Sequence, residues 1–240
     1  MIKVTVWNEF LHEKENEQVK AVYPDGIHNC IANFLKCDDI SVKTATLEMP
    51  EHGLTKEVLE DTDVLIWWGH GAHDKVSDEI VERVHERVLK GMGFIALHSS
   101  HKSKPMMKIL GTSCDLAWRE SDDKEILWCV NPAHPIAKDV PMSFHMEADE
   151  MYGEFFDIPT PDDIVYIGWF AGGEVFRSGC TFTRGYGKAF YFQPGHETYP
   201  IYYNENIQKI IKNAVRWAAP HTKIAELNCR HAVKPAIESN

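Results

Sequence analysis

The sequence predicts an α/β fold built on a doubly wound, mostly parallel sheet, to which the second half of the chain adds antiparallel strands. Strand and helix patterns alternate through about the first hundred residues, which is typical of parallel strands joined by right-handed helical crossovers. Two of these strands are continuous apolar runs, as expected for central strands buried on both faces. Later strand patterns are separated only by turn signals, which indicates hairpins.

In the first half of the chain, the spacing of apolar residues identifies strands and helices one after another. A β-rich run, IKVTVW, spans residues 2–7, and a helical pattern with one apolar face, GIHNCIANFLK, spans 26–36. The alternating segment SVKTATL predicts a strand over 41–47. TKEVLED predicts a short helix with Thr55 as its N-cap.

The two apolar strands enclose another helix. They are DVLIWWG at 63–69 and GFIALH at 93–98. Between them, SDEIVERVHERVLKGM predicts a helix with Ser77 as its cap and acidic residues in its first turn. This succession of strands and crossovers favours a flavodoxin-like strand order.

The second half contains five further strand patterns: EILWCV, SFHMEAD, DIVYIGWF, EVFRSGCTFT and GKAFYFQPG. A long helix follows, with an apolar stripe formed by Ile207, Ile210, Ile211, Ala214, Val215 and Ala218. No repeat or linker interrupts the chain. We therefore expect one domain over residues 1–240, with a core to about residue 219 and a short polar tail over 220–240.

Composition excludes several classes of function. The formal net charge of −11 argues against a nucleic-acid partner, because phosphate binding needs clustered Lys and Arg. No apolar run is long enough to span a membrane. The six cysteines are scattered without a CxxC pair, and the N-terminus enters a strand directly, so we expect reduced thiols and a cytoplasmic protein. The absence of GxGxxG and GxxxxGK[ST] disfavours nucleotide cofactors.

Polar side chains recur where the predicted strands end. Ligands of open α/β sheets bind beyond the carboxyl ends of the strands, where these residues should meet. The candidates, in chain order, are Asn8, Glu9, His70, His73, His98, His101, His196 and Glu197. A single histidine at a strand end is more often a cap or a hydrogen-bonding group, but three strand ends that carry histidine predict a functional site.

The segment FIALHSSHKSK raises the question of a serine nucleophile. A nucleophile elbow needs small residues two positions before and after its tip, because the strand-to-helix turn is crowded. Neither Ser99 nor Ser100 has such neighbours, whereas His98 lies between Ala96 and Ser100. The elbow position is therefore assigned to His98, and the serines are interpreted as caps.

The histidines leave two kinds of chemistry open. Zn²⁺ or another divalent metal could be bound by a set of His70, His73, His98 and His196, although no HExxH or paired CxxC is present. Alternatively, neutral imidazoles could act as general base and acid, since their pKa values lie near neutrality. The sequence therefore assigns no single cofactor and leaves Zn²⁺ or another divalent metal open.

The acidic segment FHMEADEMYGEF supplies candidate carboxylates. As a strand it places Glu147 and Asp149 on one face, which we interpret as a solvated acidic face. Glu150 breaks this pattern where the strand is expected to end, and it is the better candidate for a buried acid or ligand. Aromatic residues such as Trp118 could stack on sugar rings, although buried strands also favour them.

Several of these stretches together resemble the trehalose-utilisation (ThuA-like) family over almost the whole chain. They are DVLIWWGHGAHDKV, GFIALHSSHKSK, GTSCDLAWRE, NPAHPIAKDVP, DEMYGEFFDIP, WFAGGEVFRSGCTFTRGYGKAFYFQPGHETYP and NAVRWA. That family is similar in fold to the class I glutamine amidotransferases, which agrees with the doubly wound sheet. An amidotransferase requires cysteine at the elbow, where this chain has His98, so glutamine hydrolysis is not expected.

The resemblance implies a role in the catabolism of trehalose or a related disaccharide or keto-sugar. It also supports His134 and Tyr152 as site candidates beside the strand-end residues. We expect an isomerase, lyase or hydrolase in which His98, His196 and Glu150 transfer protons, with or without a metal. The substrate-binding residues expected beside them are Asn8, Glu9, His70, His101, Tyr152 and Glu197.

A non-catalytic sugar-binding or regulatory protein on an amidotransferase-like scaffold is the alternative, since a fold alone does not define a function. A small-molecule sugar is the expected ligand in either case. Neither nucleic acid nor membrane is an expected partner. Apolar strand edges in the second half further predict a homo-oligomer.

Overall fold

The computed structural model describes residues 1–227, and its centre is one mixed sheet. Within these residues the strand order is β2-β1-β3-β4-β9-β8-β7-β5-β6. The parallel part consists of β2 (Ile40–Thr46), β1 (Ile2–Asn8), β3 (Val64–Trp68), β4 (Gly93–Leu97) and β9 (Gly187–Phe192). This is the flavodoxin-like order predicted from the sequence, with β9 in the place of the fifth strand.

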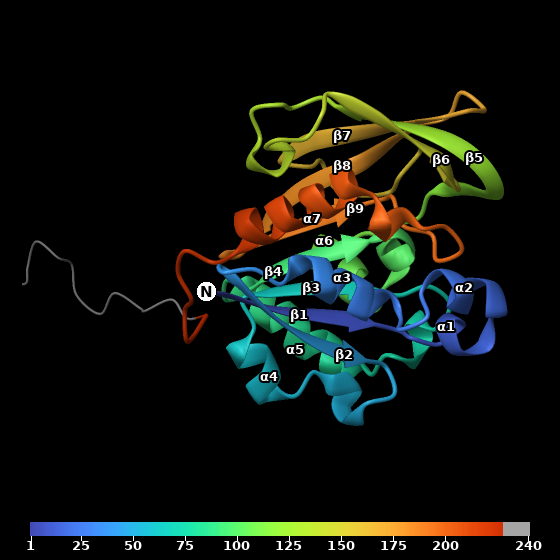
Figure 1. Cartoon of the computed structure of the whole chain (residues 1–240). Coiled ribbons are helices and arrows are strands. Elements are labelled where there is room, and N and C mark those ends of the chain that lie inside the picture. The colour runs from blue at the N-terminus through green and yellow to red at the C-terminus, as the bar shows by residue number, and fades with distance from the viewer. Residues whose placement is uncertain (228–240) are drawn as a thin grey trace, which may run out of the picture.

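The antiparallel part forms the upper region of Figure 1. It consists of β8 (Val175–Arg184), β7 (Asp163–Phe170), β5 (Ala117–Cys129) and β6 (Ser143–Gly153). The predicted added strands are therefore confirmed. Two of their bounds were wrong, since β5 begins well before EILWCV and β6 continues past Glu150. Register shifts in the β5–β6 pair interrupt the simple alternation on which those bounds were based.

Helices cover both faces of the parallel part. One face packs against α3 (Ile27–Leu35) and α7 (Glu205–Ala218), and the other packs against α4 (Lys56–Asp61), α5 (Asp78–Leu89) and α6 (Lys104–Leu110). Two short helices, α1 (His12–Glu15) and α2 (Glu17–Val22), follow β1 and were not predicted. The predicted N-caps are confirmed, because Thr55 accepts a hydrogen bond from the Val58 amide and Ser77 accepts one from Ile80.

Short 3-10 helices complete the connections. They are η1 (Pro50–Gly53), η2 (His73–Lys75), η3 (His98–Lys102), η4 (Pro135–Ala137) and η5 (Ile201–Tyr203). The helix cap before α6 is Ser103, whose hydroxyl accepts from the Met106 amide. Ser99 and Ser100, which were predicted to be caps, instead bond to the segment that ends β3. The predicted tail begins after α7, and its residues 228–240 lie outside the described residues.

Two surface properties bear on the remaining expectations. Among the described residues, no helix is both long and apolar enough to cross a membrane. Trp128 of β5 and Trp169 of β7 are exposed on the antiparallel part. These exposed apolar side chains are consistent with the predicted homo-oligomer, which stays a prediction.

Candidate functional site

The carboxyl ends of β1, β3, β4 and β9 bring together residues that are far apart in the sequence. The ring centroids of His70 and His196 lie 5.8 Å apart, and those of His98 and His196 lie 5.4 Å apart. These three histidines follow three different strands. Because parallel neighbours end at the same edge, the strand order itself positions them.

His98 occupies the turn between β4 and the helical segment that follows. Its φ of +49° lies in the left-handed region, which costs a residue with a side chain about 1–2 kcal/mol. The hydroxyl of Tyr191 donates to the His98 carbonyl at 3.0 Å and helps to hold this turn. The elbow predicted for His98 therefore exists, but the imidazole is fully buried.

His98 forms a buried pair with Glu150 of β6. Its Nδ1 donates to the Gln193 carbonyl at 2.8 Å, and its Nε2 lies 2.9 Å from Glu150 Oε2. Burial opposes the charged imidazolium, but the hydrogen bond and the charge of Glu150 prevail and raise the pKa of His98 to about 8. Burial likewise opposes the charged carboxylate, yet the bond from His98 lowers the pKa of Glu150. The two groups form an ion pair at neutral pH.

His196 faces this pair as a neutral imidazole. Burial and the nearby charge of His98 lower its pKa to about 4. Its Nδ1 lies 2.8 Å from the Thr198 hydroxyl and accepts the Thr198 amide at 3.3 Å. The remaining proton is therefore on Nε2, which lies 4.0 Å from Glu150 Oε2 and 3.7 Å from Glu197 Oε2.

The segment that carries His196 is held by Asp149. Its carboxylate accepts from the amides of Gly195 and His196, each at 3.2 Å. Gly195 has a φ of +146°, and a Cβ there would lie 2.1 Å from the Tyr202 hydroxyl, so only glycine fits. The interpretation of Asp149 as a solvated residue was wrong because the β6 bulge turns it inward, whereas Glu147 is exposed as expected.

A second carboxyl, Glu125 of β5, is fully buried near Asp149. Burial raises the pKa of Glu125 well above its usual range, and the charge of Asp149 adds to this effect. Burial also raises the pKa of Asp149 to about 6. Glu125 was not predicted, since a single acid in the strand EILWCV carries no signal of burial.

Two residues expected to contact substrate, Glu9 and Asn8, make hydrogen bonds to nearby segments of the chain. Both carboxylate oxygens of Glu9 accept backbone amides of the loop after β3, from His70 and Ala72 at 2.9 Å and from Gly71 at 3.1 Å. The Asn8 side chain is fully buried and donates to Glu13 at 2.6 Å. Their polar atoms hold the segments around the site, and contact of either residue with a ligand stays a prediction.

A cavity of about 260 Å³ opens beside these groups. Six predicted site residues line it: His70, His73, His101, Glu150, Tyr152 and His196. His98 and Glu197 do not line it and contact lining residues from behind. The lining residues that the site prediction omitted are Ser99, Lys102, Asp115, Trp118 and Glu120. Trp118 and Glu120 belong to the charged first part of β5, which the sequence did not reveal as a strand.

His101 and Tyr152 complete the inner wall of the cavity. His101 Nδ1 donates to the Cys114 carbonyl at 2.7 Å, so the neutral ring presents Nε2 as an acceptor. Burial lowers the pKa of His101 to about 4. The Tyr152 ring stacks on His98, with centroids 4.9 Å apart, and burial raises the pKa of its hydroxyl well above the usual range. The Tyr152 hydroxyl therefore keeps its proton and can donate a hydrogen bond.

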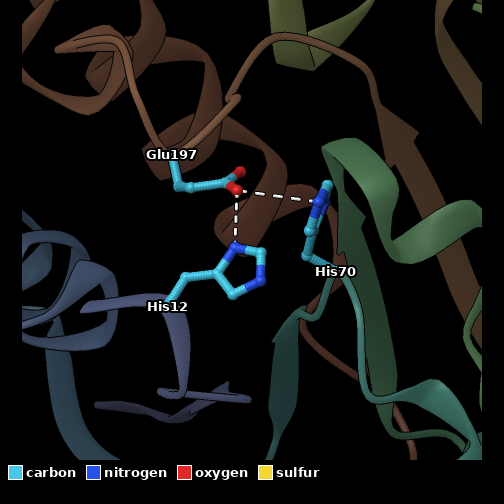
Figure 2. A group of neighbouring side chains, drawn as sticks. All are labelled: His12, His70 and Glu197. Carbon is cyan, nitrogen blue, oxygen red and sulfur yellow. Dashed lines mark hydrogen bonds and ion pairs between the residues drawn. The ribbon is translucent and has the colours of Figure 1, made fainter. Parts of the chain in front are cut away.

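A second group of histidines and a carboxylate lies at the same edge (Figure 2). His12 Nδ1 lies 2.8 Å from Glu197 Oε1, and His70 Nε2 lies 3.6 Å from the same oxygen. Burial opposes the charge of Glu197, but the bond from His12 prevails and lowers its pKa to about 2. His12 was not predicted, because it lies in an unrecognised helix beyond the end of β1.

The four histidines predicted as one metal-binding set do not form one group. Among the described residues, the groups with the spacing of metal ligands are His12–His70–Glu197 and His98–Glu150–His196. His73 belongs to neither group. His134, suggested by resemblance, accepts the Ile136 amide at the start of η4 and packs against Trp217, which is a structural role.

Comparison with known proteins now fixes the family. The sequence pattern of the ThuA family, described as trehalose utilisation, matches residues 3–218. The chain belongs to the ThuA family. No curated protein matches this ThuA chain in sequence.

Solved structures share the fold of this ThuA chain at low sequence identity. A ThuA-like protein of Bacteroides uniformis is 15% identical, with a TM-score of 0.64 over 90% of this chain and 91% of the other. A ThuA-like protein of Parabacteroides merdae is 16% identical, with a TM-score of 0.64 over 93% and 92%. A Thermoplasma acidophilum protein described as part of a GMP synthase is 12% identical, with a TM-score of 0.51 over 90% and 93%. The amidotransferase-like fold is thus confirmed.

Proposed function

We propose that this ThuA-family chain is an enzyme of sugar catabolism that moves a proton at a carbon beside the carbonyl of an oxidised sugar. The observation that carries the proposal is the pairing of a carboxylate with a neutral imidazole at the cavity wall. Glu150 is ionised by its bond to His98, and His196 presents an Nε2–H toward it. Both of these side chains line the cavity.

This pairing suits proton abstraction beside a carbonyl. Glu150 removes a proton from the carbon, and the electron pair of the broken C–H bond forms a C=C bond while the carbonyl oxygen becomes an enolate oxygen. The neutral imidazole of His196 donates a hydrogen bond from its Nε2–H to that oxygen and so stabilises the enolate. Delivery of the proton to the former carbonyl carbon gives isomerisation when the hydroxyl proton of the adjacent carbon passes to the enolate oxygen and a new carbonyl forms there. Alternatively, loss of a β-substituent with its bonding electron pair restores the carbonyl and gives elimination.

His98 acts through Glu150 and not on the substrate. Its ring is fully buried, and both of its nitrogens already have partners, the Gln193 carbonyl and Glu150. This arrangement fixes the orientation of the carboxylate and keeps it ionised. The catalytic role expected for His98 therefore becomes a positioning role in this proposal.

The lining of the cavity favours a neutral sugar. Three carboxylates, those of Asp115, Glu120 and Glu150, line it together with a single lysine, Lys102. That lysine is paired with Asp115 at 3.0 Å, and Glu150 is paired with His98. A phosphorylated sugar would therefore find no unpaired lysine in the lining and would be repelled by Glu120. Trp118 is 63% exposed at the rim and offers a flat face on which a sugar ring can stack. The family description, trehalose utilisation, points to a disaccharide-derived substrate.

Hydrogen exchange tests the proposal directly. The protein would be incubated in D₂O with trehalose oxidised to a ketone at one ring position, and deuterium entry beside the carbonyl would be followed by NMR. We expect exchange in the wild type and a loss of about 10²–10⁴-fold in Glu150→Gln, which removes the base. Glu147→Gln is the matched control, because Glu147 is an exposed acid of the same strand.

Each alternative predicts a different result. Calorimetric binding of the keto-sugar without exchange or turnover would favour a sugar-binding protein and overturn the enzymatic proposal. Equal exchange in Glu150→Gln and Glu147→Gln would show that Glu150 is not the base. We further propose a cytoplasmic location, since the cysteines of the described residues are free thiols, as expected in a reducing compartment.

A further inference from the structure

We propose that His12, His70 and Glu197 bind one divalent transition-metal ion at the edge of the cavity. This inference goes beyond the proposed proton transfer and does not rest on it. His12 begins α1, His70 follows β3, and Glu197 follows β9, so three separate segments converge on one point (Figure 2). The three potential ligand atoms lie within 4.8 Å of one another.

The distances suit a shared ion. Tetrahedral ligands placed about 2.0–2.1 Å from Zn²⁺ lie about 3.3 Å from each other. The two distances to Glu197 Oε1 are 2.8 Å from His12 Nδ1 and 3.6 Å from His70 Nε2, which bracket that value. Small rotations of the side chains would therefore form the site without movement of the backbone.

The hydrogen bonds of His70 leave the correct nitrogen free. The Ser99 hydroxyl donates to the Gly69 carbonyl at 3.0 Å, so it must accept from His70 Nδ1, which lies 3.0 Å away. With Nδ1 donating to Ser99, Nε2 is the nitrogen of His70 that faces the carboxylate of Glu197 and can bind an ion. Ser99 would then serve as the outer partner that orients a metal-bound histidine.

Glu197 supplies an independent observation. Its side chain is only 4% exposed, and its Oε2 has no hydrogen-bond partner although it is buried. A buried carboxylate oxygen without a partner carries a large desolvation cost. One bond from His12 to Oε1 does not compensate both oxygens, whereas an ion can bind the carboxylate through either or both of them.

The set of donor atoms defines the class of ion. Two imidazole nitrogens and one carboxylate suit Zn²⁺, Co²⁺, Fe²⁺ or Mn²⁺, whereas Mg²⁺ and Ca²⁺ prefer oxygen ligands. Three protein ligands leave a further position open, as in catalytic zinc sites. His12 and His70 are partly exposed, and His70 also lines the cavity, so a water or a ligand can reach that position.

The other group, His98–Glu150–His196, is less suited to an ion. Both nitrogens of His98 already have protein partners, and its ring is fully buried. His196 uses Nδ1 to bond Thr198 and presents Nε2 with its proton. Metal binding there would break the His98–Glu150 ion pair and would require His196 to lose the proton on Nε2.

Titration of the metal-free chain of residues 1–240 with Co²⁺ tests the site. Visible d–d absorption reports coordination, and metal analysis after desalting gives the stoichiometry, so neither readout depends on activity. We expect one ion per chain and loss of at least about tenfold in affinity for His12→Ala and Glu197→Gln. His73→Gln is the control, because His73 lines the same cavity but lies outside the group, and it should bind like the wild type.

Circular dichroism of each metal-free variant shows whether it is folded before titration. If Glu197→Gln does not fold, the His12→Ala variant decides the test alone, because His12 is at the surface. The proposal is overturned if the wild type binds no Co²⁺ or Zn²⁺, which would make the group an ion pair only. It is equally overturned if His12→Ala binds the ion as tightly as the wild type.

Discussion

Two groups of two histidines and one glutamate lie side by side at the same sheet edge, yet their surroundings give them different chemistry. In the first group, His98–Glu150–His196, every member is at least nine-tenths buried, and His98 has a partner on each nitrogen. In the second, His12–His70–Glu197, only the glutamate is buried, and one of its oxygens has no hydrogen-bond partner.

The difference shows that residue type alone does not decide between an ion pair and a metal site. Burial with complete hydrogen bonding favours a fixed charge pair that can hold a base in place. Side chains that are partly exposed and have free lone pairs favour the binding of a metal ion from solvent. Stability, pH dependence and metal affinity should therefore separate the two groups.

The largest effect is expected for His98→Ala. Removing His98 leaves Glu150 as a buried charge without its partner, so the free energy of unfolding should fall by about 3–5 kcal/mol. Urea denaturation at neutral pH measures this change. The double variant His98→Ala/Glu150→Gln should recover part of the loss, because it no longer has the buried and unpaired charge of Glu150. Strict additivity of the two single variants would show that the residues do not act as a pair.

The pH dependence of stability should follow the same pair. The pKa of folded His98, about 8, lies above its ordinary value of 6.5, so its stabilising effect is complete below pH 6.5 and is lost as the pH rises through 8. The free energy of unfolding should fall by about 2 kcal/mol over this rise in pH. The pKa of Glu150 is lowered, so its effect is present above its ordinary 4.5 and is lost on further acidification.

The comparison is made against His98→Gln/Glu150→Gln, in which both titrating groups are absent. The free energies of unfolding of the wild type and of this double variant, measured from pH 5 to pH 9, should approach each other at the alkaline end. Parallel curves over that range would contradict the ion pair.

A smaller effect is expected for Ser99→Ala in the second group. The Ser99 hydroxyl orients His70, so its removal should weaken metal binding by about 10–100-fold and leave the fold intact. Co²⁺ titration measures the affinity. Ser100→Ala is the matched control, since Ser100 is a buried serine of the same turn that bonds the Trp67 carbonyl and no histidine. Equal affinities in the two variants would remove the proposed role of Ser99.

The smallest effect is expected for His12→Ala without metal. His12 is about one-third exposed, so its pair with Glu197 should contribute only about 0–1 kcal/mol to the free energy of unfolding. Urea denaturation in the presence of a chelator measures this. A loss as large as that of His98→Ala would mean that the two groups do not differ in the way described.

Much of the fold could be predicted from the sequence, because periodicity reports burial. The continuous apolar runs that became β3 and β4 placed His70 and His98 at one edge, and turn signals revealed the antiparallel strands. Small neighbours alone located the elbow at His98.

The details of the site could not be predicted, because they depend on contacts between distant segments. Glu9 and Glu197 are similar acids at strand ends, but one holds backbone amides and the other meets two histidines. A bulge turned Asp149 inward, and an unpredicted short helix brought His12 to the edge. Neither the bulge nor the short helix produces a periodic pattern of apolar residues in the sequence.

Anomalous diffraction from crystals of the metal-free protein soaked in Zn²⁺ tests the contrast between the groups most directly. Data at the zinc absorption edge should show one peak between His12 Nδ1, His70 Nε2 and Glu197 Oε1. A peak among His98, Glu150 and His196, or no peak at either group, would contradict it.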